Sequence, residues 1–235
     1  MHISTLLFSG REAYGADLQA TLACTLRASH AHLPALRQAH VYLVMRHIAT
    51  DSVTPSQASI PVVQRCAEVE VIVECAFEDA AAAAENAMLP AWRWFLAHAG
   101  KAGTLLYVIE ATSNVSIPLA RQAEDGGFRR LMFLRRAAAD PKRFHDAWFG
   151  RHAELVRNLP FVDGYLQNLV LACQDSDLQD LPYATLSVDG IAHLCFAGEE
   201  DMLAAYASEA RLPLREDGRL LLDGVDTLLV HGVAR

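Results

Sequence analysis

The segment DPKRFHDAWFGRHAELVRNLPFVDGYLQNLVL, residues 140–171, predicts one amphipathic helix, a turn and one strand. Asp140 and Pro141 are typical of a helix start, because an Asp side chain caps free backbone N–H groups and proline suits the first helical position. Spacings of four, four, three and four residues place one set of side chains on a single helix face. The members of this face are Phe144, Trp148, His152, Leu155 and Leu159. Pro160 ends the helix.

His152 is the polar member of this apolar face. A buried imidazole needs a hydrogen-bond partner, because leaving it unpaired costs free energy. The sequence leaves two interpretations open: a core histidine bonded to a backbone carbonyl, or a histidine that faces a pocket. In the strand that follows the turn, period-two alternation places Tyr165 and Gln167 on one face and Asn168 on the other.

Residues 128–235 carry an ordered set of motifs. A strand precedes a helix with the pattern Trp-x-x-x-His, which is followed by Leu-Pro and by a strand with the pattern Gly-Tyr-x-Gln-Asn. The segment 189–196 (DGIAHLCF) and the helix predicted after it complete the set. Together these motifs resemble the EthD family, whose members are often described as oxidoreductases. His193 departs from the family's pattern, since such strands often carry an acidic residue at its position.

The composition is that of an ordinary globular protein. The chain has 235 residues, of which 52% are hydrophobic and 20% charged, and its formal net charge is −8. This length suffices for one large or two small domains. A protein that binds duplex nucleic acid needs a basic face, and no such partner is expected here. The local cluster of Arg129, Arg130, Arg135 and Arg136 is expected to bracket a strand and to stay solvated.

The five cysteines are odd in number and form no CxxC motif, which is typical of buried thiols in a reducing compartment. Residues 1–10 hold an apolar run that is too short for a signal peptide. No stretch approaches the roughly 18 uncharged apolar residues of a transmembrane helix. We therefore expect a cytoplasmic protein without a membrane partner.

The predicted elements occur twice in the order β-α-β-β-α-β. The first set has strands at 2–9, 39–47, 67–77 and 104–110, and helices at 11–33 and 79–98, the latter expected to be kinked or divided at Pro90. The second set has strands at 129–136, 162–172, 189–196 and 225–231, and helices at 140–159 and 199–210. Offsets of 120 to 123 residues relate four landmark pairs, namely His30 and His152, Tyr42 and Tyr165, Cys75 and Cys195, and Thr104 and Thr227.

This order predicts two tandem ferredoxin-like repeats. The predicted boundaries are 1–112 for a divergent N-terminal repeat, 113–127 for a linker, and 128–235 for the EthD-like repeat. We expect an α+β fold in which each repeat forms an antiparallel sheet with two helices on one face. The resemblance implies that the two sheets close face to face into an α/β-barrel. Closure could occur within one chain, as a pseudo-dimer, or between the chains of a homodimer.

The strand faces can then be assigned. The purely apolar faces are expected to pack on the helices, and the mixed faces are expected to line the barrel. On this assignment the barrel interior holds His40, Tyr42, Arg46, Glu70, Glu74, Tyr107, Tyr165, Gln167 and His193. The alternative is that Glu68, Glu70 and Glu74 face water on a half-exposed sheet.

Polar side chains that converge in an apolar cavity are typical of a small-molecule site. His152 or His193 could move a proton at a carbon next to a carbonyl group, with Tyr165 as a third catalytic candidate. The predicted substrate-binding residues are Trp148, Gln167, Tyr42, Arg46 and Glu70. The resemblance implies a cofactor-independent oxygenase or oxidoreductase, or a dehydratase-like lyase. In such enzymes the deprotonated substrate supplies the electrons, so no metal or other cofactor is expected.

Two other functions stay open. Chlorite-dismutase-like and dye-peroxidase-like proteins share the doubled architecture and bind haem through a helical histidine, a part that His152 could play. The barrel could also be a non-catalytic small-molecule binding module in which one repeat only closes the pocket of the other. The first repeat favours this second possibility, since it has Leu26 where the other has Trp148 and lacks the Gln-Asn pair.

Overall fold

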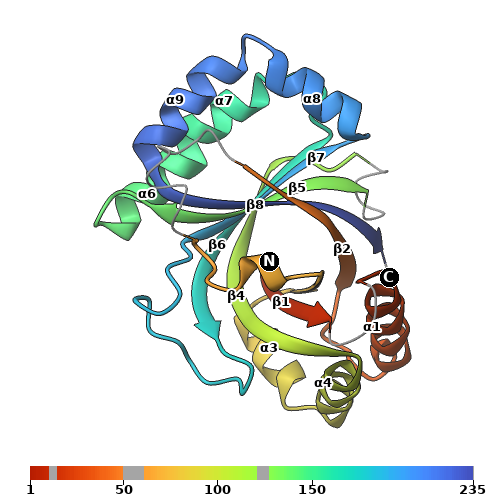
Figure 1. The fold of residues 1–235 in the computed structure, drawn as a ribbon. Coiled ribbons are helices and arrows are strands. Elements are labelled where there is room, and N and C mark those ends of the chain that lie inside the picture. Colours follow the sequence, from red (N-terminus) through yellow and green to blue (C-terminus); the bar gives the residue numbers. More distant parts are fainter. Residues whose placement is uncertain (11–14, 50–60, 121–126, 235) are drawn as a thin grey trace.

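The computed structural model describes residues 1–10, 15–49, 61–120 and 127–234, and within these ranges eight antiparallel strands form one closed barrel (Figure 1). The strands are β1 (His2–Gly10), β2 (Gln38–Ile48), β3 (Val71–Phe77), β4 (Gly103–Ile117), β5 (Phe128–Arg136), β6 (Gly164–Gln174), β7 (Gly190–Phe196) and β8 (Leu222–Ala234). Their order around the barrel is β1-β3-β2-β8-β5-β7-β6-β4.

Helices cover the outside of the barrel. The first half contributes α1 (Gly15–His30), a 3₁₀ turn η1 (Cys66–Glu68), α3 (Ala80–Ala87) and α4 (Pro90–Ala102). The second half contributes α6 (Pro141–Ala147), a π-helical turn η2 (Trp148–His152), α7 (Ala153–Arg157), α8 (Glu199–Ala207) and α9 (Arg211–Leu221). Figure 1 shows the two helix groups on opposite sides of the barrel. Within the described residues, none of the helices has the length and apolar character that crossing a membrane requires.

The strand order explains how the barrel closes. The strands of the first half are neighbours in the order β4-β1-β3-β2, and those of the second half in the order β8-β5-β7-β6. The two sheets join through the antiparallel pairs β2–β8 and β4–β6. The expected α+β barrel is therefore confirmed, and it closes within a single chain.

Several element boundaries differ from the prediction. β4 continues to Ile117, inside the segment expected to be a linker. Pro90 divides the second helical region as predicted, and Asp79 caps α3 by accepting a hydrogen bond of 2.8 Å from the N–H of Ala82. Helix α9 was not predicted. Its sequence contains Pro213 and Gly218, two residue types of low helix propensity, which conceal its amphipathic pattern.

The quoted segment begins as predicted. Asp140 accepts a hydrogen bond of 2.9 Å from the N–H of Lys142, and Pro141 occupies the first helical position. The helix then differs from the uniform α-helix that was expected, because its middle is a π-turn that contains Gly150. Such turns insert one residue into the helical repeat and change the direction of the side chains that follow.

Three apolar clusters hold the layers together. One lies between the first sheet and α1, α3 and α4, and includes Leu22, Phe95 and Cys75. A second lies between the second sheet and its helices and includes Trp148. The third fills part of the barrel interior and includes Tyr42. The central part of each sheet is therefore covered on both faces, so the polar pattern of a strand does not show which face meets the barrel interior.

Two of the landmark pairs do not occupy equivalent positions. Cys75 packs against the helices, whereas Cys195 lies near Tyr42 in the barrel. Tyr42 faces the barrel interior, whereas Tyr165 faces the helices. The order of elements agrees with the prediction. Residue identity at a fixed offset, however, does not identify the equivalent face of a strand, because a shift of one residue moves every side chain to the opposite face.

Candidate active site at the end of the barrel

A cavity of about 280 Å³ opens at one end of the barrel. Its polar lining includes His40 on β2, Glu74 on β3, Arg129 on β5 and Asn168 on β6. Its apolar lining includes Ile3 on β1 and Leu166 on β6. The four polar side chains are each less than 10% exposed. An apolar cavity with a few convergent polar groups is the usual form of a small-molecule site.

A buried network anchors Glu74. His193 lies beside it, fully buried, with Nε2 at 3.0 Å from Glu74 Oε1. The other ring nitrogen, Nδ1, is 3.5 Å from Nη1 of Arg129. His193 therefore contacts the Glu74 carboxylate through one ring nitrogen and the Arg129 guanidinium group through the other. Thr5 Oγ1 donates to the same carboxylate oxygen at 3.3 Å.

This network keeps Glu74 ionised. Burial by itself raises the pKa of a carboxyl group, because the charged form loses its hydration. The charge and hydrogen bond of His193, with the charges of Arg129 and His40, outweigh this effect and lower the pKa of Glu74 to about 2. Glu74 is therefore a fixed negative charge at neutral pH and a poor acceptor of protons.

Tyr42 forms the aromatic wall of the network. Its ring stacks on His40 at 5.7 Å between centroids, and the guanidinium carbon of Arg129 lies 5.0 Å from the ring centroid. Burial raises the pKa of Tyr42 well above its ordinary value, although Arg129 opposes this, so the phenol stays protonated. The carbonyl oxygen of Asn168 has no hydrogen-bond partner within the described residues, so a bound molecule could donate to it.

The barrel site contains only part of the predicted set. His193 and Tyr42 lie in the barrel interior, as expected, and contact residues that line the cavity without lining it themselves. Arg129 was expected to be solvated, and that expectation is wrong: it is 1% exposed. Its charge can be buried because Glu74, on the neighbouring sheet, offsets it.

Four predicted site residues, of which Tyr165 and Gln167 were expected inside the barrel, lie on the helix side of the second sheet. Trp148 donates from Nε1 to the hydroxyl of Tyr165 at 3.1 Å, and Gln167 donates from Nε2 to the carbonyl of Trp148 at 2.7 Å. His152 Nδ1 lies 2.9 Å from Asp217 Oδ2 on α9. The placement of Tyr165 and Gln167 inside the barrel was therefore wrong. The face of β6 that carries Asn168 is the interior one.

The cavity beside His152 is small. It measures about 40 Å³, because Trp148, Tyr165 and Leu214 fill the space between the sheet and the helices. A ligand pocket usually measures about 300–1,000 Å³. The residues present therefore do not accommodate a haem at His152 in this arrangement.

Arg46 and Glu70 lie outside the barrel network. Arg46 is about half exposed and forms an ion pair with Glu199 at the start of α8. The carboxylate of Glu70 lies beside Gly15 at the start of α1. Both residues were expected in the interior. Arg46 lies near the end of β2, and Glu70 lies just before the start of β3. At such positions the alternation of side chains along a strand no longer predicts which face a residue occupies.

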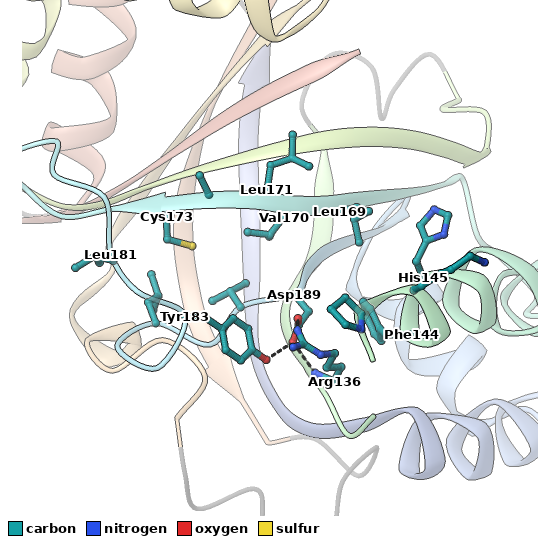
Figure 2. A pocket seen from close by; sticks show the side chains of 15 residues that line it. Arg136, Phe144, His145, Leu169, Val170, Leu171, Cys173, Leu181, Tyr183 and Asp189 are labelled. Carbon is teal, nitrogen blue, oxygen red and sulfur yellow. Dashed lines mark hydrogen bonds and ion pairs between the residues drawn. The ribbon is translucent and has the colours of Figure 1, made fainter. Parts of the chain in front are cut away.

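A larger hollow of about 590 Å³ lies between β6, α6 and the segment 181–189. Figure 2 shows the side chains that line it. Tyr183 donates to Asp189 at 2.7 Å, and Arg136 forms an ion pair with the same carboxylate and stacks on the Tyr183 ring at 4.5 Å. These polar groups bond to one another on one wall, whereas aliphatic side chains of β6 line another. The polar groups on this wall of the hollow are therefore already paired with one another.

The sequence contained a signal for the missed residues. In the segment 128–136, Arg129 alternates with Leu131 and Phe133, two side chains that fill the barrel. His40 and Glu74 were predicted to face the interior but were given no role. The signal for Asn168 was its place beside Gln167, on the opposite face of the same strand.

Comparisons with known proteins agree with this fold. The EthD domain model matches residues 136–224. A candidate monooxygenase from Lactobacillus acidophilus is similar in structure, with a TM-score of 0.57, 13% identity, and coverage of 98% of this chain and 93% of that one. An anthrone oxidase-like protein has a TM-score of 0.57, 11% identity, and coverage of 99% and 93%.

A candidate monooxygenase from Fusobacterium nucleatum has a TM-score of 0.60 at 7% identity, with coverage of 99% of this chain and 92% of that one. At such low identity these likenesses establish the fold alone. No curated protein sequence matches the chain. The matched segment lies within the part of the chain that resembled EthD by its motifs, and it includes the helix with Trp148 and the strand with His193. The resemblance to the EthD family is therefore confirmed for residues 136–224, which match the EthD domain model.

Proposed function

We propose that the protein is a small-molecule enzyme that removes a proton from a carbon next to a carbonyl group, and that the reaction takes place at the barrel end. The observation that carries this proposal is the convergence of His40, Glu74, Arg129 and Asn168 on one cavity of about 280 Å³. The names of the structural neighbours, which include monooxygenases and an anthrone oxidase-like protein, support an oxidative reaction on an aromatic ketone.

His40 is the proposed base. It lines the cavity, whereas His193 does not, and a neutral imidazole is suited to accept a proton near neutral pH. Accepting the proton makes the imidazole cationic. The carboxylate of Glu74 would stabilise that cation, because its depressed pKa keeps it ionised beside His40. His193 and Thr5 hold the carboxylate in place and are positioning residues.

Arg129 is the proposed oxyanion partner. When the C–H bond gives up its proton, the electron pair moves into the enolate and negative charge develops on the carbonyl oxygen. A guanidinium group fixed at the wall of a cavity stabilises such a charge. The enolate can then expel a leaving group, which is a lyase reaction, or reduce dioxygen, which is an oxygenase reaction. Consumption of dioxygen distinguishes the two.

Deuterium exchange tests the first step without knowledge of the complete reaction. Anthrone and 2-tetralone carry an acidic C–H next to or conjugated with a carbonyl group, and exchange in D₂O is followed by proton NMR. The wild-type protein is expected to accelerate exchange, and His40→Asn is expected to lose about a hundredfold or more of this acceleration. The matched control is His145→Asn, because His145 is a partly exposed histidine on α6 that does not line the barrel-end cavity.

Two results would count against the proposed enzymatic function or against the role of His40 in it. Exchange that is equally fast in His40→Asn would exclude His40 as the base. Tight binding of these ketones at the barrel end without any exchange would favour a non-catalytic binding module, the alternative that the sequence left open.

A further inference from the structure

A second cavity lies in the first half of the chain, on the opposite side of the sheet from the barrel interior. It measures about 280 Å³ and lies between β1 and β4 on one side and α3 and α4 on the other. Four alanines of α3 line it and leave the space open, namely Ala80, Ala83, Ala84 and Ala87. The corresponding space in the EthD half measures about 40 Å³, because the Trp148 ring packs directly on Gly190.

One end of this cavity is polar. His2 Nε2 lies 2.6 Å from Glu110 Oε2, and the hydroxyl of Ser4 donates to the same oxygen at 2.7 Å. His2 and Ser4 are buried, and the Glu110 side chain is 24% exposed. Within the described residues no donor reaches the second oxygen, Oε1. The carboxylate is therefore fixed in position with one oxygen left for a further donor.

Asn86 provides an independent observation. It lines the same cavity, near the end of α3, and is only 1% exposed. Neither its amide nitrogen nor its amide oxygen has a hydrogen-bond partner within the described residues. Because an unpaired buried amide is costly, a side chain in this state is suited to a bound molecule that pairs with it.

Most of the remaining wall is apolar, although Gln174 also lines the cavity. Leu6, Phe77, Trp92, Leu96 and Val108 face the cavity. A volume of about 280 Å³ between such side chains suits a molecule of one or two aromatic rings. A hydroxyl or amino group on the ring would donate to Glu110, since an anionic acceptor forms a stronger hydrogen bond than a neutral one.

We propose that this cavity is a second binding site, separate from the barrel end, and that it takes a small aromatic molecule with a hydroxyl or amino group. Glu110, fixed by His2 and Ser4, accepts the hydrogen bond of that group. Asn86 pairs with a polar group elsewhere on the molecule. The site does not depend on the function proposed for the barrel, because none of these residues lines the barrel cavity.

Fluorine NMR titration of the full chain with 4-fluorophenol tests the proposal, and fluorobenzene serves as the apolar counterpart. Ala83→Leu fills the cavity and is expected to abolish binding of both probes. The matched control is Ala81→Leu, because Ala81 is exposed on the same helix and does not line the cavity. Glu110→Gln is expected to weaken 4-fluorophenol about tenfold and to leave fluorobenzene unchanged.

Leu166→Phe narrows the barrel-end cavity instead, so binding that persists in this variant is assigned to the second site. A cooperative thermal transition in each variant establishes that it is folded. The proposal is overturned if wild-type protein binds no 4-fluorophenol up to about 10 mM, a concentration that detects even weak fragments. It is also overturned if Ala83→Leu binds normally, if only Leu166→Phe loses binding, or if Glu110→Gln leaves the affinity for 4-fluorophenol unchanged.

Discussion

Glu74→Gln removes the charge around which the barrel network is built and keeps the shape of the side chain. The pKa of Glu74 is about 2, against an ordinary value of 4.5. At about 1.4 kcal/mol per pKa unit, the ionised form contributes about 3 kcal/mol more to stability than the protonated form. Since Gln resembles the protonated form, the variant should lose about 3 kcal/mol of unfolding free energy at neutral pH.

The sign of the pH dependence follows from the lowered pKa. The stabilisation by Glu74 is present in full above about pH 4.5 and is lost as the pH falls toward 2, where the native carboxylate takes up its proton. The stability difference between wild type and Glu74→Gln should therefore shrink in acid and reach about half its neutral value near pH 3.

Urea denaturation of both proteins, followed by circular dichroism at about pH 7, 5, 4 and 3, measures this difference. The control is Glu78→Gln, because Glu78 is 69% exposed and its ion pair with Arg37 should contribute less than about 1 kcal/mol. Equal stability of wild type and Glu74→Gln at pH 7 would refute the reasoning. A difference that persists unchanged at pH 3 would show that the carboxylate charge is not its source.

Two further substitutions test the packing. Arg129→Met should destabilise the protein by about 3–5 kcal/mol in urea denaturation at pH 7, because the buried charge of Glu74 then loses a nearby cation. A loss below about 1 kcal/mol would contradict the charge interaction between the two side chains. Gly190→Ala should cost about 1–3 kcal/mol, since a Cβ there would lie 2.5 Å from the Trp148 ring, and unchanged stability would show that this contact is loose. Gly150→Ala is the opposite case, because nothing lies within 4 Å of the added Cβ. The variant should be more stable by about 1 kcal/mol in thermal unfolding. A loss of stability would contradict the open surroundings of Gly150.

The order of the elements could be predicted from the sequence because each signal is local. Alternation marks the strands, Asp140 and Pro141 mark the start of a helix, and Pro90 marks a division. Helix α9 was missed because Pro213 and Gly218 weaken the local signal, and its helical state depends on packing against the second sheet.

The faces of the strands could not be predicted in the same way. In a barrel covered by helices both faces of a strand are buried, so a polar residue does not indicate which face meets the cavity. Tyr165 therefore lies among the helices although it is polar, and Asn168 lies beside His193 in the barrel. Arg129 was predicted to be a surface residue because the negative charge near it, that of Glu74, comes from the other half of the chain. A local sequence pattern does not show such a contact.

The most direct test of the barrel-end site compares His40 with His152, a histidine that the sequence analysis named as a catalytic candidate. The rate of anthrone deuterium exchange is measured for wild type, His40→Asn and His152→Asn, with urea denaturation to establish that each is folded. We predict that His40→Asn loses about a hundredfold or more of the acceleration. His152→Asn should keep its rate within about twofold and lose only the stability of the contact with Asp217. Loss of exchange in His152→Asn with normal exchange in His40→Asn would contradict the barrel-end site and place the base in the helix layer.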